Sequence, residues 1–131
     1  MKRILYLSIL ALSFSACKKD PDQSAFNGTY VGTFRTIVDG KMTSSEASII
    51  FKGNRYQSLK GRGSGKFVLV DKMVRFTDEN IWTADFDWGL ILNNDYQYKT
   101  KGDSLILDKM IPYHPNQVYN YYQYRLKRIR Q

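Results

Sequence analysis

The sequence is poor in the residues that most often perform chemistry, with one cysteine (Cys17) and one histidine (His114) among 131 residues. A single cysteine excludes a disulfide within the chain. A zinc site needs several ligands, and a hydrolytic triad needs a nucleophile together with a histidine held by an acid. His114, between a tyrosine and a proline, is expected to be an ordinary surface residue. We therefore expect no catalytic residue, no metal site, no cofactor and no enzymatic activity.

Long hydrophobic runs are also missing. The most apolar stretch, residues 4–14, contains two serines and follows the basic start Met1-Lys2-Arg3. A membrane-spanning helix needs about 20 apolar residues, whereas a secretory signal has a basic start and an apolar core of about 7 to 15 residues. Residues 1–16 are therefore predicted to be a signal peptide.

The residues that follow this apolar run carry a recognisable motif. Ser15-Ala16-Cys17 resembles the lipobox of bacterial lipoproteins, although Phe14 replaces the usual aliphatic residue. The resemblance implies cleavage before Cys17, lipid attachment to its sulfur, and location in the cell envelope as an outer-membrane lipoprotein. Acylation would also remove the lone thiol that an exported chain would otherwise expose.

Residues 17–25 are polar and contain a proline, which predicts a flexible spacer between the lipidated cysteine and a folded domain over residues 26–131. The formal net charge is +8. It stays strongly positive without the signal peptide, so anionic surfaces such as lipid headgroups or acidic glycans are favoured partners. Nucleic acid is not expected, because the protein is exported and its basic residues are spread along the chain.

From Phe26 onward, apolar and polar residues alternate with period two, which indicates strands with one buried face. The strands are expected at 29–35, 47–52, 56–60, 67–70, 74–77, 81–89, 95–99, 105–107 and 121–129. The glycine-rich run 61–65 predicts a turn or bulge, and the two prolines within 110–120 predict a loop.

Short connections between neighbouring strands favour one all-β architecture. A closed meander barrel and a two-sheet sandwich both fit eight or nine short antiparallel strands. We expect the barrel, with about eight strands, because no long Greek-key connection is present and closure removes exposed strand edges.

Segment 81–89 is the most amphipathic part of the sequence. It places Trp82, Phe86 and Trp88 on one predicted face, where they would pack in the core or line a ligand. Asp85 and Asp87 share the opposite face. Two such carboxylates could form an acid–base pair or a cation site, but a solvated strand face is the simpler interpretation.

Two runs resemble the first and last strands of small lipocalin-like lipoproteins of Gram-negative bacteria: FNGTYVGTF at residues 26–34 and YQYRLK at 122–127. In lipocalins a Gly-x-Trp motif on the first strand meets a basic residue from near the end of the barrel. Gly28 and Tyr30 occupy that motif with tyrosine for tryptophan, and Arg125 or Arg128 would supply the basic residue. The resemblance implies a lipocalin-like barrel and binding of a small apolar or amphipathic molecule.

An eight-stranded barrel has room for its own side chains or for one small ligand, and the sequence leaves both alternatives open. The candidate ligand-binding residues are Tyr30, Trp82, Phe86, Trp88, Tyr96, Tyr98, Tyr122 and Tyr124. The alternative function is a non-enzymatic interaction module that contacts envelope proteins or anionic glycans. Its contact surface would be the tyrosine-rich, basic segment 119–130, although alternation also explains these tyrosines as an inward face.

Overall fold

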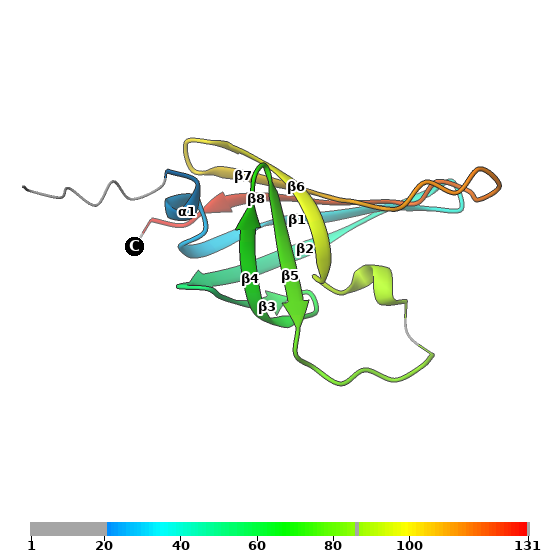
Figure 1. Ribbon diagram of the computed structural model, residues 1–131, viewed down its shortest axis with the longest axis horizontal. Coiled ribbons are helices and arrows are strands. Elements are labelled where there is room, and N and C mark those ends of the chain that lie inside the picture. The colour runs from blue at the N-terminus through cyan, green and yellow to red at the C-terminus, as the bar shows by residue number, and fades with distance from the viewer. Residues whose placement is uncertain (1–20, 86, 131) are drawn as a thin grey trace, which may run out of the picture.

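The computed structural model describes residues 21–85 and 87–130, so the predicted signal peptide and Cys17 lie outside the described residues (Figure 1). The elements are helix α1 (Pro21–Ala25), strands β1 (Gly28–Val38), β2 (Lys41–Lys52), β3 (Arg55–Lys60), β4 (Ser64–Val70), β5 (Met73–Asp78), β6 (Asn94–Lys101), β7 (Ser104–Lys109) and β8 (Tyr121–Arg128), and the 3-10 helix η1 (Trp88–Leu90). Each strand pairs antiparallel with the next, and β8 pairs with β1 to close the barrel. The predicted meander barrel is confirmed.

Tight turns join most neighbouring strands. The turn between β1 and β2 has only Asp39 and Gly40 between the paired residues Val38 and Lys41, and both turn residues have positive φ, 50° and 74°. Two consecutive left-handed residues define the hairpin turn whose twist matches that of the flanking strands. Glycine and aspartate tolerate this conformation, so the local sequence supports the register of the long β1–β2 hairpin.

The predicted inward faces form one hydrophobic core inside the barrel. Tyr30 and Phe34 of β1 are buried with Ala47, Ile49 and Phe51 of β2. The other strands contribute Tyr56, Phe67, Val74, Phe76, Tyr96, Tyr98, Leu105, Leu107, Tyr122, Tyr124 and Leu126. Period-two alternation therefore identified the buried face of nearly every strand correctly.

The strand predicted over 81–89 is wrong. β5 ends at Asp78, and the next strand begins only at Asn94, with η1 between them. The side chain of Ile81 is 100% exposed and that of Trp88 is 54% exposed, while Phe86 lies outside the described residues. From this connection Leu92 joins the core inside the barrel, and Ile91 is also almost fully buried.

Residues 21–25, predicted to belong to a flexible spacer, instead form α1. The residue directly after the helix is Phe26, whose side chain is fully buried in the core and whose N–H donates to the Gln23 carbonyl at 3.2 Å. Ala25 packs against the same core. The spacer prediction therefore needs correction, because Phe26 anchors the preceding turn of chain to the barrel.

α1 has five residues, and no helix within 21–85 and 87–130 has the length and apolar character to cross a membrane.

The strand directions give the barrel two different ends (Figure 1). The proximal end, as we call it, holds α1, the β2–β3, β4–β5 and β6–β7 turns, and the end of β8. The distal end holds the β1–β2 turn, the β3–β4 connection and the loops 79–93 and 110–120. β1 and β2 extend past β3 at the distal end, since β2–β3 pairing stops at Ser48 and Lys60.

At Gly32 on β1, the close approach of β8 leaves no room for a side chain. A Cβ atom at Gly32 would lie 1.9 Å from the carbonyl oxygen of Arg125 on β8. We expect Gly32→Ala to force β1 and β8 apart and to lower the free energy of unfolding by about 2 kcal/mol or more, measured by urea denaturation. Gly53→Ala is the control, because a Cβ there meets no atom within 4 Å and adds only the strain of its positive φ, about 1 kcal/mol. An equal loss of unfolding free energy in the two variants would contradict the close approach of β1 and β8 at Gly32.

Candidate functional site

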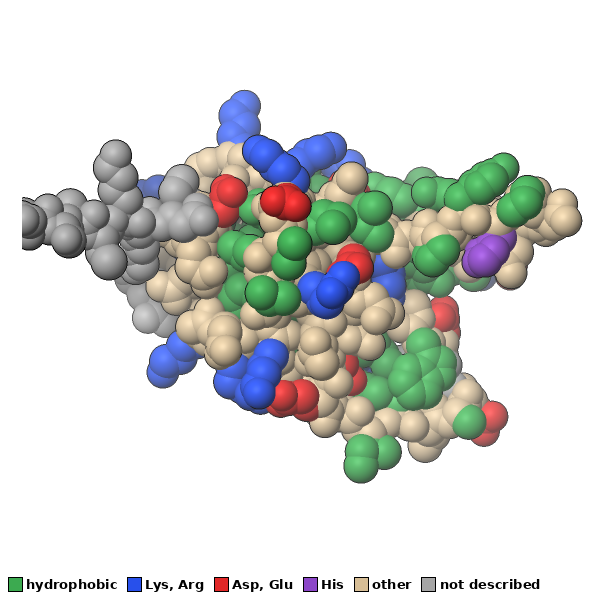
Figure 2. Space-filling model, in the orientation of Figure 1, with side chains coloured by type: hydrophobic (Ala, Val, Ile, Leu, Met, Phe, Trp, Pro, Cys, Tyr) green, Lys and Arg blue, Asp and Glu red, His purple; other side chains and the backbone are tan. Residues whose placement is uncertain are grey.

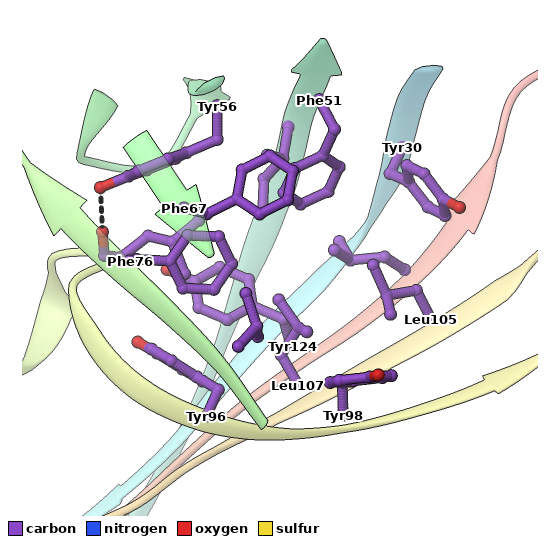
Figure 3. Close-up of a cluster of buried hydrophobic side chains, with 14 of the residues drawn as sticks. Tyr30, Phe51, Tyr56, Phe67, Phe76, Tyr96, Tyr98, Leu105, Leu107 and Tyr124 are labelled. Carbon is purple, nitrogen blue, oxygen red and sulfur yellow. Dashed lines mark hydrogen bonds between the residues drawn. The ribbon is translucent and has the colours of Figure 1, made fainter. Parts of the chain in front are cut away.

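The barrel interior contains most of the predicted ligand-binding residues. Tyr30, Tyr96, Tyr98, Tyr122 and Tyr124 are all buried there, with exposed fractions below 8%. Figure 3 labels all of them except Tyr122. The two tryptophans are not with them. Trp82 and Trp88 lie in the loop 79–93, so the structure brings five of these eight residues together and leaves these two outside.

Aromatic rings occupy the interior from end to end. Near the proximal end, the rings of Phe26 and Phe51 meet edge to face with centroids 5.3 Å apart. In the middle, Phe76 contacts Tyr96 at 5.5 Å. Phe34 stacks on Tyr124 at 4.3 Å toward the distal end. These separations are those of rings in direct contact, so the structure favours filling by the chain's own side chains, one of the two alternatives that the sequence left open.

Three tyrosine hydroxyls are enclosed among these rings. Tyr56 donates its hydroxyl proton to the Leu92 carbonyl at 2.5 Å, and this bond ties the loop 79–93 to β3. The hydroxyls of Tyr96 and Tyr124 are buried and have no hydrogen-bond partner among the described residues. Burial raises the pKa of all three tyrosines above the ordinary value, because a phenolate cannot be solvated inside the barrel.

These raised pKa values make stability depend on pH in the alkaline range. Above about pH 10 the unfolded chain loses phenolic protons that the folded barrel retains, so the free energy of unfolding falls as pH rises. We expect the tyrosinate absorbance of Tyr56, Tyr96 and Tyr124 to appear together with the loss of the far-UV circular dichroism of the barrel. Tyr124→Phe removes an unpartnered hydroxyl and should shift the alkaline unfolding midpoint upward. Tyrosinate formation by these residues in a barrel that stays folded would contradict the prediction.

Lys109, at the end of β7, is a functional candidate that our sequence analysis missed. Its Nζ lies 5.7 Å from the centre of the Tyr96 ring and 5.6 Å from that of Tyr122. It also makes long contacts of 3.5 Å with the carbonyl oxygens of Gly89 and Ile91. Burial lowers the pKa of the Lys109 amine. Alternation contained the signal, because Lys109 follows the inward residues Leu105 and Leu107 at the same spacing.

Lys109 and its neighbours close the distal end of the barrel beneath η1. A Cβ atom at Gly89 would lie 2.5 Å from the tip of the Tyr122 ring, so only glycine lets η1 approach this closely. Asp87 caps η1 by accepting a hydrogen bond from the Gly89 N–H at 2.8 Å. Asp85 is exposed in the adjoining turn. Asp87 therefore shapes a turn, and the predicted strand face shared by the two carboxylates does not exist.

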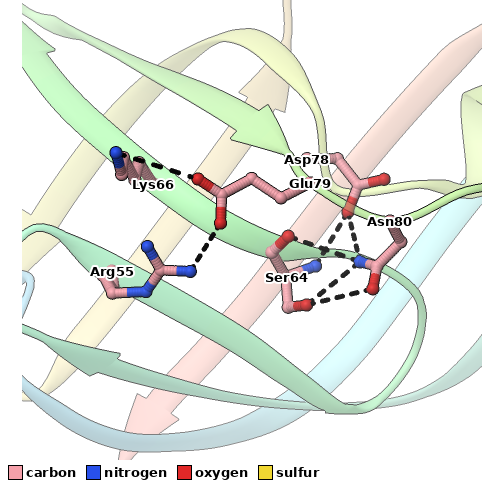
Figure 4. Close-up of polar contacts among 6 residues, drawn as sticks. All are labelled: Arg55, Ser64, Lys66, Asp78, Glu79 and Asn80. Carbon is pink, nitrogen blue, oxygen red and sulfur yellow. Dashed lines mark hydrogen bonds and ion pairs between the residues drawn. The ribbon is translucent and has the colours of Figure 1, made fainter.

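A polar network fixes the start of the loop 79–93 (Figure 4). The Asp78 carboxylate accepts hydrogen bonds from the Ser64 N–H at 2.9 Å, from the Asn80 amide at 2.6 Å and from the Trp82 indole N–H. Glu79 pairs with Arg55 on the neighbouring outer surface. The indole of Trp82 therefore serves to hold the loop, which is a different role from the ligand wall that the sequence suggested.

The proximal end is closed by Arg128. Its Nε and Nη2 atoms donate to the Tyr30 hydroxyl at 3.1 and 2.8 Å, and Nη2 also donates to the Ser24 carbonyl at 2.8 Å. Tyr30 in turn donates to the Ala25 carbonyl. Of the two arginines considered from the sequence, Arg128 makes the contact with Tyr30. Arg125 is exposed on the outer face and donates to the Gln123 side chain.

Large apolar side chains are exposed on the loop 110–120. Tyr113 is 77% exposed, Val118 67% and Tyr119 65%, and Met42 of the adjacent hairpin is similarly open. Pairing of Ile37 with Tyr121 places the end of this loop beside β1. Figure 2 shows hydrophobic side chains along this arm, close to the exposed His114. We call Met42, Tyr113, Val118 and Tyr119 the distal apolar surface.

The predicted tyrosine-rich, basic surface is divided by the structure. Tyr122 and Tyr124 point inward, whereas Arg125 and Lys127 are exposed on the outer face of β8. Tyr119 belongs to the distal apolar surface. Tyr122 and Tyr124 are therefore not accessible to a partner at the contact surface predicted for this segment.

Comparison of this chain with protein-family models, curated proteins and solved structures finds no significant match.

Proposed function

We propose that this protein is a non-enzymatic binding module, anchored in the cell envelope through acylated Cys17, that contacts another envelope protein through its distal apolar surface. The observation that carries the proposal is the exposure of Tyr113, Val118 and Tyr119 on one loop. Clustered large apolar side chains on a protein surface mark contact sites, and aromatic residues are enriched in the centres of protein interfaces. The loop 110–120 contains no charged Asp, Glu, Lys or Arg residue.

The packing of the interior supports a surface contact over a ligand carrier. The residues that would line a ligand, such as Tyr96 and Tyr124, contact other rings of the core, with their own centroids 6.2 Å apart. A small apolar ligand would have to displace these side chains. The lipocalin-like assignment remains part of the proposal and is supported by the barrel and by the contact between Arg128 and Tyr30.

In-cell photo-crosslinking tests the proposed contact. A photoreactive amino acid at Val118 should yield a discrete adduct with another protein, and Tyr113→Ser/Tyr119→Ser should reduce that adduct by about tenfold or more, as expected when anchor side chains are lost. The control places the same photoreactive residue at Val68, which is 53% exposed on the side of the barrel. The same adduct from both positions, or an adduct insensitive to the double variant, would overturn the proposal.

A further inference from the structure

Charge is distributed unevenly between the two ends of the barrel. The proximal turns and the end of β8 carry five exposed basic residues, against three acidic residues in α1 and the same turns. The basic residues are Lys52, Lys72, Lys101, Lys127 and Arg130, and the acidic ones are Asp22, Asp71 and Asp103. At the distal end, the loop 110–120 has no charged residue, and the loop 79–93 has three acidic residues and no basic one, while Arg35 and Lys41 near the β1–β2 turn and Lys60 and Arg62 at the β3–β4 connection are basic. Figure 2 shows Lys and Arg side chains over the body of the molecule, in contrast to the hydrophobic arm.

Several of the proximal charges are not neutralised by the protein. Among the described residues, Lys52, Lys72 and Lys101 have no ion-pair partner. Arg130 does have one, because its guanidinium lies 2.8 Å from Asp103. Exposed lysines without partners keep their full attraction for external anions within a Debye length, about 8 to 10 Å in physiological salt.

The chain also enters the barrel at this end. α1 lies against the β2–β3 turn, where Gln23 donates to the Gly53 carbonyl. If Cys17 is acylated as proposed above, the four residues 17–20 before α1 reach at most about 14 Å when fully extended. The anchor then holds the proximal end within range of the headgroups, and the distal apolar surface faces away from the bilayer.

We propose that the proximal end is a binding surface for anionic phospholipid headgroups, contacted through Lys52, Lys72 and Lys101. This inference rests on the proposed anchor for its biological setting, but the surface itself is a property of the folded barrel. Each lysine near an anionic bilayer adds attraction that corresponds to about a fivefold gain in affinity at low salt. Contact through this surface would fix the orientation of the barrel relative to the membrane, which a single flexible lipid attachment would leave free.

The test uses the unacylated chain 17–131 with Cys17→Ser, which separates this surface from the lipid anchor. Its probes are vesicles of phosphatidylcholine alone and vesicles with about one third phosphatidylglycerol. We expect salt-sensitive binding to the anionic vesicles only. Lys52→Glu/Lys101→Glu should weaken binding by at least about tenfold, since two attractive charges become repulsive. Arg35→Glu/Lys41→Glu makes the same change in net charge at the distal end and should weaken it by less than about threefold.

Orientation is measured in the same cysteine-free background. A fluorophore on Asn54→Cys, in the proximal β2–β3 turn, should transfer energy efficiently to an acceptor on the lipid headgroups, whereas a fluorophore on Gln117→Cys, in the loop 110–120, should transfer little. Absence of binding to anionic vesicles, equal weakening by the two double variants, or stronger transfer from the distal label would overturn the inference. A wrong anchor assignment would be seen in a separate measurement, because intact-mass analysis of the native protein would then show no lipid on Cys17.

Discussion

Replacing Cys17 with serine is expected to move the protein from the membrane fraction to the soluble fraction. Under the proposed anchoring, the acyl chains on Cys17 supply most of the stable attachment. Burial of acyl chains contributes about 0.8 kcal/mol for each methylene group. Fractionation of cells followed by intact-mass analysis of the protein measures both the location and the lipid.

The control for this result is Ser24→Ala, which changes the short helix near the anchor and leaves Cys17 in place. Membranes must be washed at about 1 M salt, where the Debye length falls to about 3 Å and electrostatic attachment through the basic proximal end is screened. Serine-substituted protein that remains in the washed membranes would contradict acylation at Cys17 as the anchor.

Phe76→Ala is expected to lower the free energy of unfolding by about 3 to 5 kcal/mol, the usual cost of removing a buried ring. Phe76 is 1% exposed and lies in the centre of the aromatic packing. Its ring centroid is 4.8 Å from that of Tyr56 and 5.5 Å from that of Tyr96. Chemical denaturation measures the loss, and Val68→Ala on the exposed face should change stability by less than about 0.5 kcal/mol.

The same variant tests whether the barrel is filled. Loss of the Phe76 ring leaves an apolar cavity, and such cavities bind small apolar molecules. Benzene should therefore raise the melting temperature of the alanine variant and leave that of the native protein unchanged. Stabilisation of the native barrel by benzene or by a fatty acid would mean that its interior can hold a ligand after all.

Strand alternation and turn residues were enough to predict the architecture. Each inward position of β1, β2 and β8 follows from period two, because one face of every strand must be buried when the sheet closes on itself. The turn at Gly102 follows from a residue that tolerates positive φ, whereas the turn at Asp39-Gly40 was not predicted, because residues 36–46 were assigned to no strand. Closure itself could be argued from the lack of long connections, but only the β8–β1 pairing shows it.

The segment 81–89 shows where alternation misleads. Its pattern is that of a strand, yet Asp78 accepts hydrogen bonds from Asn80 and from the Trp82 indole, which bend the chain away from the sheet directly after β5. Such a side-chain network depends on Ser64 of a neighbouring strand and cannot be read from a local pattern. Leu92, from the same connection, then occupies a place in the core that the tryptophans were expected to fill.

The candidate site was only partly predictable for the same reason. The inward tyrosines were identified by alternation, but whether they enclose a cavity depends on ring contacts across the barrel, such as Phe34 on Tyr124. Lys109 was overlooked because a lysine at an inward position contradicts the simple pattern. Its amine becomes acceptable there only because η1 supplies carbonyl oxygens and two tyrosines supply ring faces.

The extension of β2 beyond β3 also bears on how this barrel avoids aggregation. Past the last β2–β3 pair, Ser48 with Lys60, residues 41–47 have β1 on one side and no strand on the other within the described chain. Such an edge can recruit a strand from another molecule. Apart from Met42 and the buried Ala47, this edge carries the exposed polar residues Lys41, Thr43, Ser44, Ser45 and Glu46, and Glu46 pairs with Lys60. A largely polar edge of this kind disfavours the addition of a strand from a neighbouring molecule.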